Sequence, residues 1–217
     1  MLLVLLQRYK NLKSKKIYII RHGQTDFNLN GIVQGSGIDS SLNETGKAQA
    51  ALFYSKYKDY PFQKAYISVL KRTQESISQF VKDGINFEKT EALNEISWGE
   101  FDGKIDTKDK NSIYWEILNR WKSGDLKAKV EGAENPEEVR SRLLPFVSQL
   151  LASEHEEILI CMHGRAMRVL LSMLTGKPLL EMDSFLHNNL CLYVLEQKGE
   201  ELSIILENDI SHLENIL

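Results

Sequence analysis

The chain is poor in the residues that mark several classes of protein. It has only two cysteines, Cys161 and Cys191, in 217 residues, which argues against a disulfide-rich secreted scaffold. Its net charge of −3 argues against a basic surface for nucleic acid. No stretch approaches the roughly 20 apolar residues of a membrane span. With 42% hydrophobic residues, the chain suits one large globular domain, and we expect both cysteines to be buried free thiols in a reducing compartment.

The N-terminus lacks the features of a secretory signal. Its apolar run, residues 1–6, is short, and the positive charges at residues 8–16 come after it rather than before. A signal peptide needs a preceding positive region and roughly 7–15 apolar residues. We therefore expect residues 1–16 to be an N-terminal extension of a cytoplasmic protein and residues 17–217 to form a single domain.

The most informative segment is YIIRHGQTDFN, residues 18–28. Its apolar start predicts a buried strand, and Gly23 allows the backbone to turn sharply as it leaves. Arg21 and His22 then lie at the carboxyl end of the strand, where open α/β sheets bind ligands. A guanidinium can bind a phosphoryl group bidentately, and a neutral imidazole can attack one. The segment predicts a phosphoryl-transfer site; the alternative is a strand that ends in these residues by accident.

Four further segments carry polar residues at a strand end or in a loop before a helix. They are DSSLNETGKAQA (39–50), SVLKRT (68–73), LNEISWGEFDG (93–103) and ILICMHG (158–164). Together with residues 18–28, they resemble the histidine phosphatase superfamily, with its phosphoglycerate mutase-like fold, over about residues 16–195. The resemblance implies an α/β three-layer sandwich: a mostly parallel central sheet with helices on both faces and a small cap insertion at about residues 97–134.

The pattern along the chain alternates strand and helix, as such a sheet requires. Strands are expected at 17–20, 65–69, 87–91, 158–162, 190–195 and 202–206, and helices at 44–57, 73–82, 112–122 and 166–174, with a further helix after residue 135. That last helix has the clearest start: Asn135 as N-cap, Pro136 at its first position and Glu138 completing a capping box. No internal repeat or linker divides the chain.

His22 is the expected nucleophile. Transfer of the phosphoryl group to its ring nitrogen, as a covalent phosphohistidine, divides one difficult displacement into two easier ones. The imidazole must be neutral, with one nitrogen free and the other donating to an acceptor. Positive charge for the phosphoryl group comes from Arg21, Arg72 and His163, because the carboxyl ends of parallel strands meet at one edge of a sheet. This set calls for no metal and no cofactor.

The resemblance adds further residues to the site. Asn28 matches the family's amide that binds the phosphoryl oxygens, and Gly164 follows His163 in the family's second His-Gly pair, so both join Arg21 and Arg72 as expected substrate-binding residues. His163 is the third expected catalytic residue, with a buried core histidine as the alternative.

Glu95 is the expected proton donor. An alkoxide leaving group departs badly unless it is protonated, so a carboxylic acid must reach it. The same carboxylate can then deprotonate the water that hydrolyses the phosphohistidine. Glu95 stands before Gly99 as the family's acid does, although Glu91 and Glu100 compete for the role. One departure lies nearby: many phosphatases of the family read Trp-Glu-Gly where this chain has Phe-Asp-Gly at 101–103.

Other conspicuous residues carry plainer interpretations. Arg165 and Arg168 follow His163, and we expect a solvated or structural role for them, although Arg165 could reach substrate. His155, His187 and His212 have no spacing that builds a metal site. The tryptophans, among them Trp98, are more typical of packing than of a pocket.

The sequence thus predicts a metal-independent phosphomonoester hydrolase that acts on a small phosphorylated metabolite, without nucleic-acid or membrane partners. One alternative is a phosphoglycerate mutase, whose family members carry Arg-x-Tyr-Gly after the acid where this chain has ISWG at 96–99. The other is a non-catalytic phosphate-binding relative. Neither the substrate nor the oligomeric state follows from the sequence.

Overall fold

The computed structural model describes residues 14–104, 109, 112–199 and 201–214, in which a six-stranded sheet has the order β3-β2-β4-β1-β5-β6. Neighbours among β3, β2, β4 and β1 pair in parallel, and β5 and β6 add to β1 as an antiparallel hairpin. The strands are β1 (Lys15–Arg21), β2 (Lys64–Ile67), β3 (Phe87–Lys89), β4 (Glu157–Met162), β5 (Leu192–Lys198) and β6 (Glu201–Asp209). The expected mostly parallel α/β sheet is confirmed.

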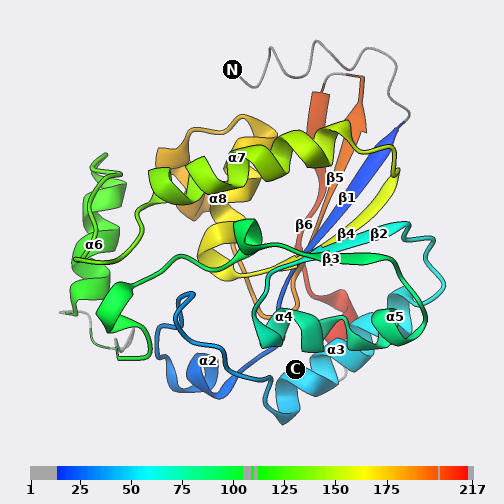
Figure 1. Ribbon diagram of the computed structural model, residues 1–217, viewed down its shortest axis with the longest axis horizontal. Helices are drawn as coiled ribbons and strands as arrows, with labels where there is room; N and C mark the ends of the chain where they lie inside the picture. The colour runs from blue at the N-terminus through cyan, green and yellow to red at the C-terminus, as the bar shows by residue number, and fades with distance from the viewer. Residues whose placement is uncertain (1–13, 105–108, 110–111, 200, 215–217) are drawn as a thin grey trace.

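Helices cover both faces of this sheet (Figure 1). One face packs against α7 (Pro136–Ala152) and α8 (Gly164–Thr175), and the other against α3 (Glu44–Tyr57), α4 (Lys71–Ser76) and α5 (Ser78–Lys82). Two helices lie away from these layers in Figure 1, namely α2 (Asp26–Asn30) and α6 (Ile113–Lys122). Short 3-10 turns are η2 (Glu91–Leu93), η3 (Gly99–Phe101), η4 (Leu179–Ser184) and η5 (Ser211–Leu213).

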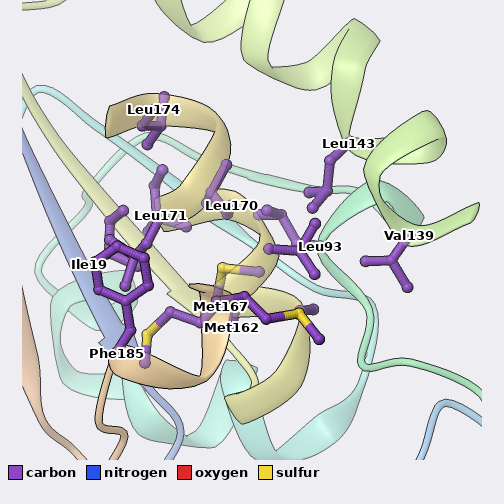
Figure 2. Close-up of a cluster of buried hydrophobic side chains, with 14 of the residues drawn as sticks. Ile19, Leu93, Val139, Leu143, Met162, Met167, Leu170, Leu171, Leu174 and Phe185 are labelled. Carbon is purple, nitrogen blue, oxygen red and sulfur yellow. The ribbon is translucent and has the colours of Figure 1, made fainter. Parts of the chain in front are cut away.

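The alternation of side chains along β1 explains why both faces are covered. Ile17 and Ile19 point into the core beneath α7 and α8, whereas Tyr18 and Ile20 point into the core beneath α3 and α5. All four are buried, as expected of a strand that is enclosed on both sides. Figure 2 shows the first of these cores, in which α8 is packed between the sheet and α7.

Most expected elements are confirmed, with shifted ends. The helix expected at 44–57 has those bounds, and the capping box of Asn135 and Glu138 forms at the start of α7. The helix expected at 73–82 is instead interrupted at Ile77, a fully buried residue with φ −112° and ψ 14°. The short helix α2 was not expected, because five residues are too few for a hydrophobic period to register.

The first strand begins at Lys15, two residues earlier than expected. The Lys15 side chain is buried and its Nζ donates hydrogen bonds to three carbonyl oxygens at the end of α7, those of Leu150, Leu151 and Ser153. A cation there offsets the negative end of the helix dipole, while burial lowers the pKa of Lys15 to about 8. Of the expected extension over residues 1–16, residues 1–13 lie outside the described residues.

Candidate active site

Three adjacent parallel strands bring the site together at their carboxyl ends. Arg21 is the last residue of β1 and His22 follows it, His163 follows β4, and β2 leads through Ser68 into α4 with Arg72. The rings of His22 and His163 lie 5.1 Å apart between centroids. The strand ends meet as the sequence predicted, although 141 positions separate the two histidines.

A backbone carbonyl determines the tautomer of His22. Its Nδ1 lies 2.7 Å from the carbonyl oxygen of Gly23, which can only accept, so Nδ1 carries the proton and Nε2 keeps a lone pair. Burial, together with the charges of Arg72 and Arg21, holds the pKa of His22 well below its ordinary value. The ring is therefore neutral at physiological pH, with an unprotonated lone pair on Nε2.

Arg72 and His163 form a buried pair beside His22. Arg72 donates from Nε to Nδ1 of His163 at 3.2 Å, and its other nitrogens donate to the carbonyl oxygens of Ile38 (2.6 Å) and Gly35 (3.4 Å). Because Nδ1 of His163 accepts, Nε2 carries the ring proton, and it lies 2.7 Å from Ser68 Oγ. Burial lowers the pKa of Arg72 to about 10, so it stays charged. Ser68 is a site residue that only the fold reveals.

A cavity of about 110 Å³ opens over His22. Five of the seven predicted site residues line it: Arg21, His22, Asn28, Glu95 and Gly164. Arg72 and His163 are fully buried and do not line it. Seven further residues complete the wall: Ile32, Val33, Gln34, Trp98, Tyr114, Arg165 and His187.

Among the carboxylates considered, Glu95 is the one that lines the cavity. Its Oε1 accepts from the backbone nitrogens of Ile96 (3.0 Å) and Ala166 (2.8 Å), and Oε2 accepts from that of Arg165 (3.1 Å). A carboxylate oxygen has two lone pairs, so Oε2 keeps one that these contacts do not use. The N-terminus of α8 thus orients Glu95, and Oε2 is the oxygen suited to carry a proton.

Asn28 presents its amide nitrogen. Its Oδ1 accepts from the backbone nitrogen and Oγ1 of Thr25 and from Nδ2 of Asn189, at 3.1–3.2 Å. With the oxygen occupied, the group that Asn28 can offer to a phosphoryl oxygen is its Nδ2 donor. The same contacts form the cap of α2, so this short helix holds the side chain in place.

Arg21 is held by His187, for which the sequence predicts no role in the site. Its Nη1 donates to the carbonyl oxygen of His187 at 2.8 Å and lies 3.3 Å from Nδ1 of that histidine. His187 follows η4 rather than a strand, so neither spacing nor periodicity connects it with Arg21. The spacing of His187 excludes it from a metal site and predicts no other role, whereas the structure places it in the cavity wall.

Arg165 also lies in the wall, on the first turn of α8. It forms an ion pair with Asp183 and donates from Nη2 to the hydroxyl of Tyr114 at 3.2 Å. Arg168 donates to the same Asp183 oxygen at 2.5 Å but does not line this cavity. Both arginines have the expected structural contacts, and Arg165 also lines the cavity.

Asp102, at the departure from the family pattern, binds a loop. Its two carboxylate oxygens accept from the backbone nitrogens of Gly35 (2.7 Å) and Gly37 (2.9 Å). A Cβ at Gly35 would lie 2.1 Å from Asp102 Oδ1, so only glycine permits this approach. The same loop supplies the carbonyl oxygens that hold Arg72.

Within the described part of the chain, no group of three or more His, Cys, Asp or Glu side chains could hold a metal ion. No helix in that part is long and apolar enough to cross a bilayer. Both cysteines, Cys161 and Cys191, are free and buried, as expected.

Comparison with known proteins identifies the family. The model of the histidine phosphatase superfamily, branch 1, matches residues 17–210, and the chain belongs to this superfamily. This confirms the expected class, a phosphoric monoester hydrolase of the histidine phosphatase type, and the resemblance on which it was based.

Individual relatives include both phosphatases and mutases. The chain is 28% identical over 213 residues to "Putative phosphoserine phosphatase 2" of Hydrogenobacter thermophilus, covering 91% of this chain and 97% of the relative. It is 29% identical to a 2,3-bisphosphoglycerate-dependent phosphoglycerate mutase of Bartonella tribocorum, covering 75% and 82%. The solved structure of Bacillus stearothermophilus YhfR is similar with a TM-score of 0.79 and 25% identity, covering 92% of this chain and 99% of that one.

Proposed function

We propose that this protein hydrolyses small phosphomonoesters through a phosphohistidine at His22. The observation that carries the proposal is the hydrogen bond from His22 Nδ1 to the carbonyl oxygen of Gly23, since it leaves Nε2 unprotonated on a residue that, like Arg21, lines the cavity. In the first step Nε2 attacks phosphorus, the P–O bond to the alcohol breaks, and the leaving oxygen takes a proton.

Glu95 supplies that proton. Its Oε2 has a lone pair not used by the backbone of α8, and the residue lines the same cavity as His22. In the second step the resulting carboxylate removes a proton from water, water attacks phosphorus, and the N–P bond breaks to regenerate His22 and release inorganic phosphate.

Positive charge around the phosphoryl group comes from Arg21 and Arg72, with Asn28 and the Gly164 backbone as hydrogen-bond donors. His163 is neutral and supports this set by accepting a hydrogen bond from Arg72 beside His22. Arg21 and Arg72 are cationic and close enough to lower the pKa of His22. Charge stabilisation of this kind accounts for most of the barrier reduction in phosphoryl transfer. We propose accordingly that the reaction needs no metal ion and no cofactor.

Hydrolysis is favoured over mutase activity by the segment after Glu95. Ile96, Ser97 and Trp98 occupy the positions where family mutases carry an arginine and a tyrosine before the glycine, and Trp98 lines the cavity. A mutase must hold its product in place for the return of the phosphoryl group, which needs additional basic groups there. Mutase activity remains the second candidate because a mutase is among the relatives.

Three further expectations stay proposals. We propose that residues 97–134 act as a cap, supported by Trp98 and Tyr114 in the cavity wall. We propose one domain over residues 17–217, supported by a single sheet that takes strands from both ends of this range. A cytoplasmic location is supported by the two free cysteines.

The proposal is tested by trapping the phosphoenzyme. The protein is mixed with a labelled phosphomonoester and quenched in alkali, where a phosphohistidine survives, and in acid, where it is lost. We expect label on the parent protein and none on His22→Ala, with turnover abolished in the variant. His155→Ala is the matched control, because His155 precedes β4 at the opposite end of the strand from His163.

Phosphate release and isomer exchange are measured in the same reactions. Conversion of 3-phosphoglycerate to 2-phosphoglycerate faster than phosphate release would reverse the preference for hydrolysis. Turnover in His22→Ala equal to that of the parent would refute the nucleophile assignment.

A further inference from the structure

We propose that Arg165 binds a second anionic group on the substrate, so that the preferred substrate is a phosphomonoester that also carries a carboxylate or a second phosphate. The inference rests on the proposed function and specifies its substrate class. The steps above use Arg21 and Glu95 among the charged groups of the cavity wall and leave Arg165 without a role.

The backbone and the side chain of Arg165 contact different groups. Its backbone nitrogen donates to Glu95 Oε2, while its guanidinium donates to the hydroxyl of Tyr114. Both Arg165 and Tyr114 line the cavity that His22 also lines. The guanidinium carbon is 5.9 Å from the ring centroid of Tyr114 and 5.8 Å from that of Trp121. Two aromatic rings thus confine an 11%-exposed cation and limit the rotamers it can adopt.

The charge around Arg165 is not balanced. Asp183 Oδ1 accepts from both Arg165 and Arg168, so one carboxylate serves two guanidinium groups. Within the described chain, the Nε atoms of both arginines are buried without a hydrogen-bond partner. Burial would lower the pKa of Arg165, but Tyr114 and Asp183 outweigh it and raise the pKa, so the charge persists. One surplus positive charge therefore lies beside the cavity.

The surplus of positive charge beside the cavity increases during the proposed reaction. The reacting phosphoryl group neutralises the charge of Arg21. Glu95 carries no charge while it acts as the acid, because it is then protonated. Arg165 is therefore the cation of the cavity wall whose charge is not neutralised. Tyr114 adds a donor, because its oxygen accepts from Arg165 and its hydroxyl proton can go to an anion. A planar guanidinium next to a hydroxyl suits a carboxylate or phosphate, both of which accept two parallel hydrogen bonds.

The test compares matched substrates that differ in a single anionic group. O-phosphoserine and O-phosphoethanolamine differ in a carboxylate; propane-1,3-diol bisphosphate and its monophosphate differ in a phosphate. We expect the parent to prefer the more anionic member of at least one pair by about 10- to 100-fold in kcat/KM, as for a hydrogen bond to a charged group. The substrate pair that shows the preference identifies whether the second anionic group is a carboxylate or a phosphate.

Arg165→Met and Arg168→Met form a matched pair of variants. Each removes one cation from Asp183 and keeps an unbranched stem, but only Arg165 lines the cavity. We expect Arg165→Met to abolish most of the substrate preference, mainly through KM, and Arg168→Met to retain it. The ratio within a substrate pair cancels any general loss of folded enzyme.

Three outcomes would contradict the proposal. A parent without preference in either pair, or an Arg165→Met variant with the parent's preference, would show that Arg165 is a structural ion-pair partner only. Equal losses of preference in the two variants would assign the effect to Asp183 and the fold. A parent that forms no phosphoenzyme and releases phosphate from none of the four compounds would refute the proposed function itself.

Discussion

His22 illustrates how a single backbone group prepares a side chain for chemistry. A neutral histidine has two tautomers, and the Gly23 carbonyl selects the one with a free Nε2. Burial and two neighbouring guanidinium groups then disfavour protonation of that nitrogen. In the proposed mechanism His22 therefore needs no separate general base.

A first prediction concerns Glu95. Glu95→Gln should slow hydrolysis of alkyl phosphates by roughly 10²- to 10⁴-fold and that of p-nitrophenyl phosphate far less, because nitrophenolate leaves without a proton. The measurement is the ratio of the two kcat/KM values. The ratio matters because an amide nitrogen cannot accept from the backbone of α8 as a carboxylate oxygen does, so the variant also loses stability.

If both substrates lost kcat equally while their kcat/KM values stayed unchanged, Glu95 would instead act in the dephosphorylation of His22, which is common to both. An unaffected alkyl substrate would move the acid role to another carboxylate. Thermal denaturation of the variant separates either result from a loss of folded protein.

At the level of elements, the N-terminus of α8 gathers several parts of the site. His163 is its N-cap residue, Gly164 and Arg165 form its first turn, and its backbone nitrogens hold Glu95. The helix dipole adds positive potential at this end of α8, where we propose that the phosphoryl group binds. The strand-to-helix junction of β4 and α8 thus provides both charge and orientation.

A second prediction concerns the loop over residues 33–38. Asp102→Ala removes two hydrogen bonds to this loop, whose carbonyl oxygens hold Arg72. We expect about 1–3 kcal/mol less stability and a several-fold higher KM, measured by urea unfolding and steady-state kinetics. Asp125→Ala is the control, since it breaks only the exposed pair with Arg120, which is worth about 0–1 kcal/mol.

If Asp102→Ala kept the parent's KM and stability, the loop would not depend on this carboxylate. The Phe-Asp-Gly departure at 101–103 would then be without consequence for the site.

For the whole molecule, the buried histidines couple stability to pH. The folded pKa values of His22 and His163 are both well below the ordinary value of about 6.5, chiefly because burial disfavours the charged ring. Below pH 6.5 the unfolded chain binds protons that the folded chain does not, so these two groups contribute to a fall in stability as the pH decreases and contribute nothing above about pH 7.5.

The third prediction follows from this linkage. Between pH 6.5 and 5, before carboxylates titrate, the free energy of unfolding should fall by up to about 1.4 kcal/mol per pH unit for each of the two histidines. Urea unfolding at a series of pH values measures it. A stability that is constant over this range would show that both rings protonate in the folded state as easily as in the unfolded chain.

A fourth prediction tests the source of positive charge. Because we propose that Arg21 and Arg72 supply it, activity should be unchanged after dialysis against an excess of chelator. Loss of activity that one divalent ion restores would show that the phosphoryl group needs a metal.

The segments that start at a strand end were predictable in detail. Arg21-His22-Gly23 and His163-Gly164 each follow an apolar run, so the local pattern alone places them at the edge of a sheet. The helix of residues 44–57 and the capping box at Asn135 were equally accessible, because period and caps are local signals.

His187 and Tyr114 were beyond the reach of such signals. They reach the cavity from a loop and from α6, which adjoin only once the chain is folded. The sequence by itself predicted the chemistry, a histidine nucleophile with arginines at or after the ends of parallel strands, since hydrophobic period and glycine placement act over a few residues. The tertiary structure decided which nitrogen of His22 is unprotonated, which oxygen of Glu95 keeps a free lone pair and which cations line the cavity, because each depends on hydrogen bonds or packing that only the fold creates.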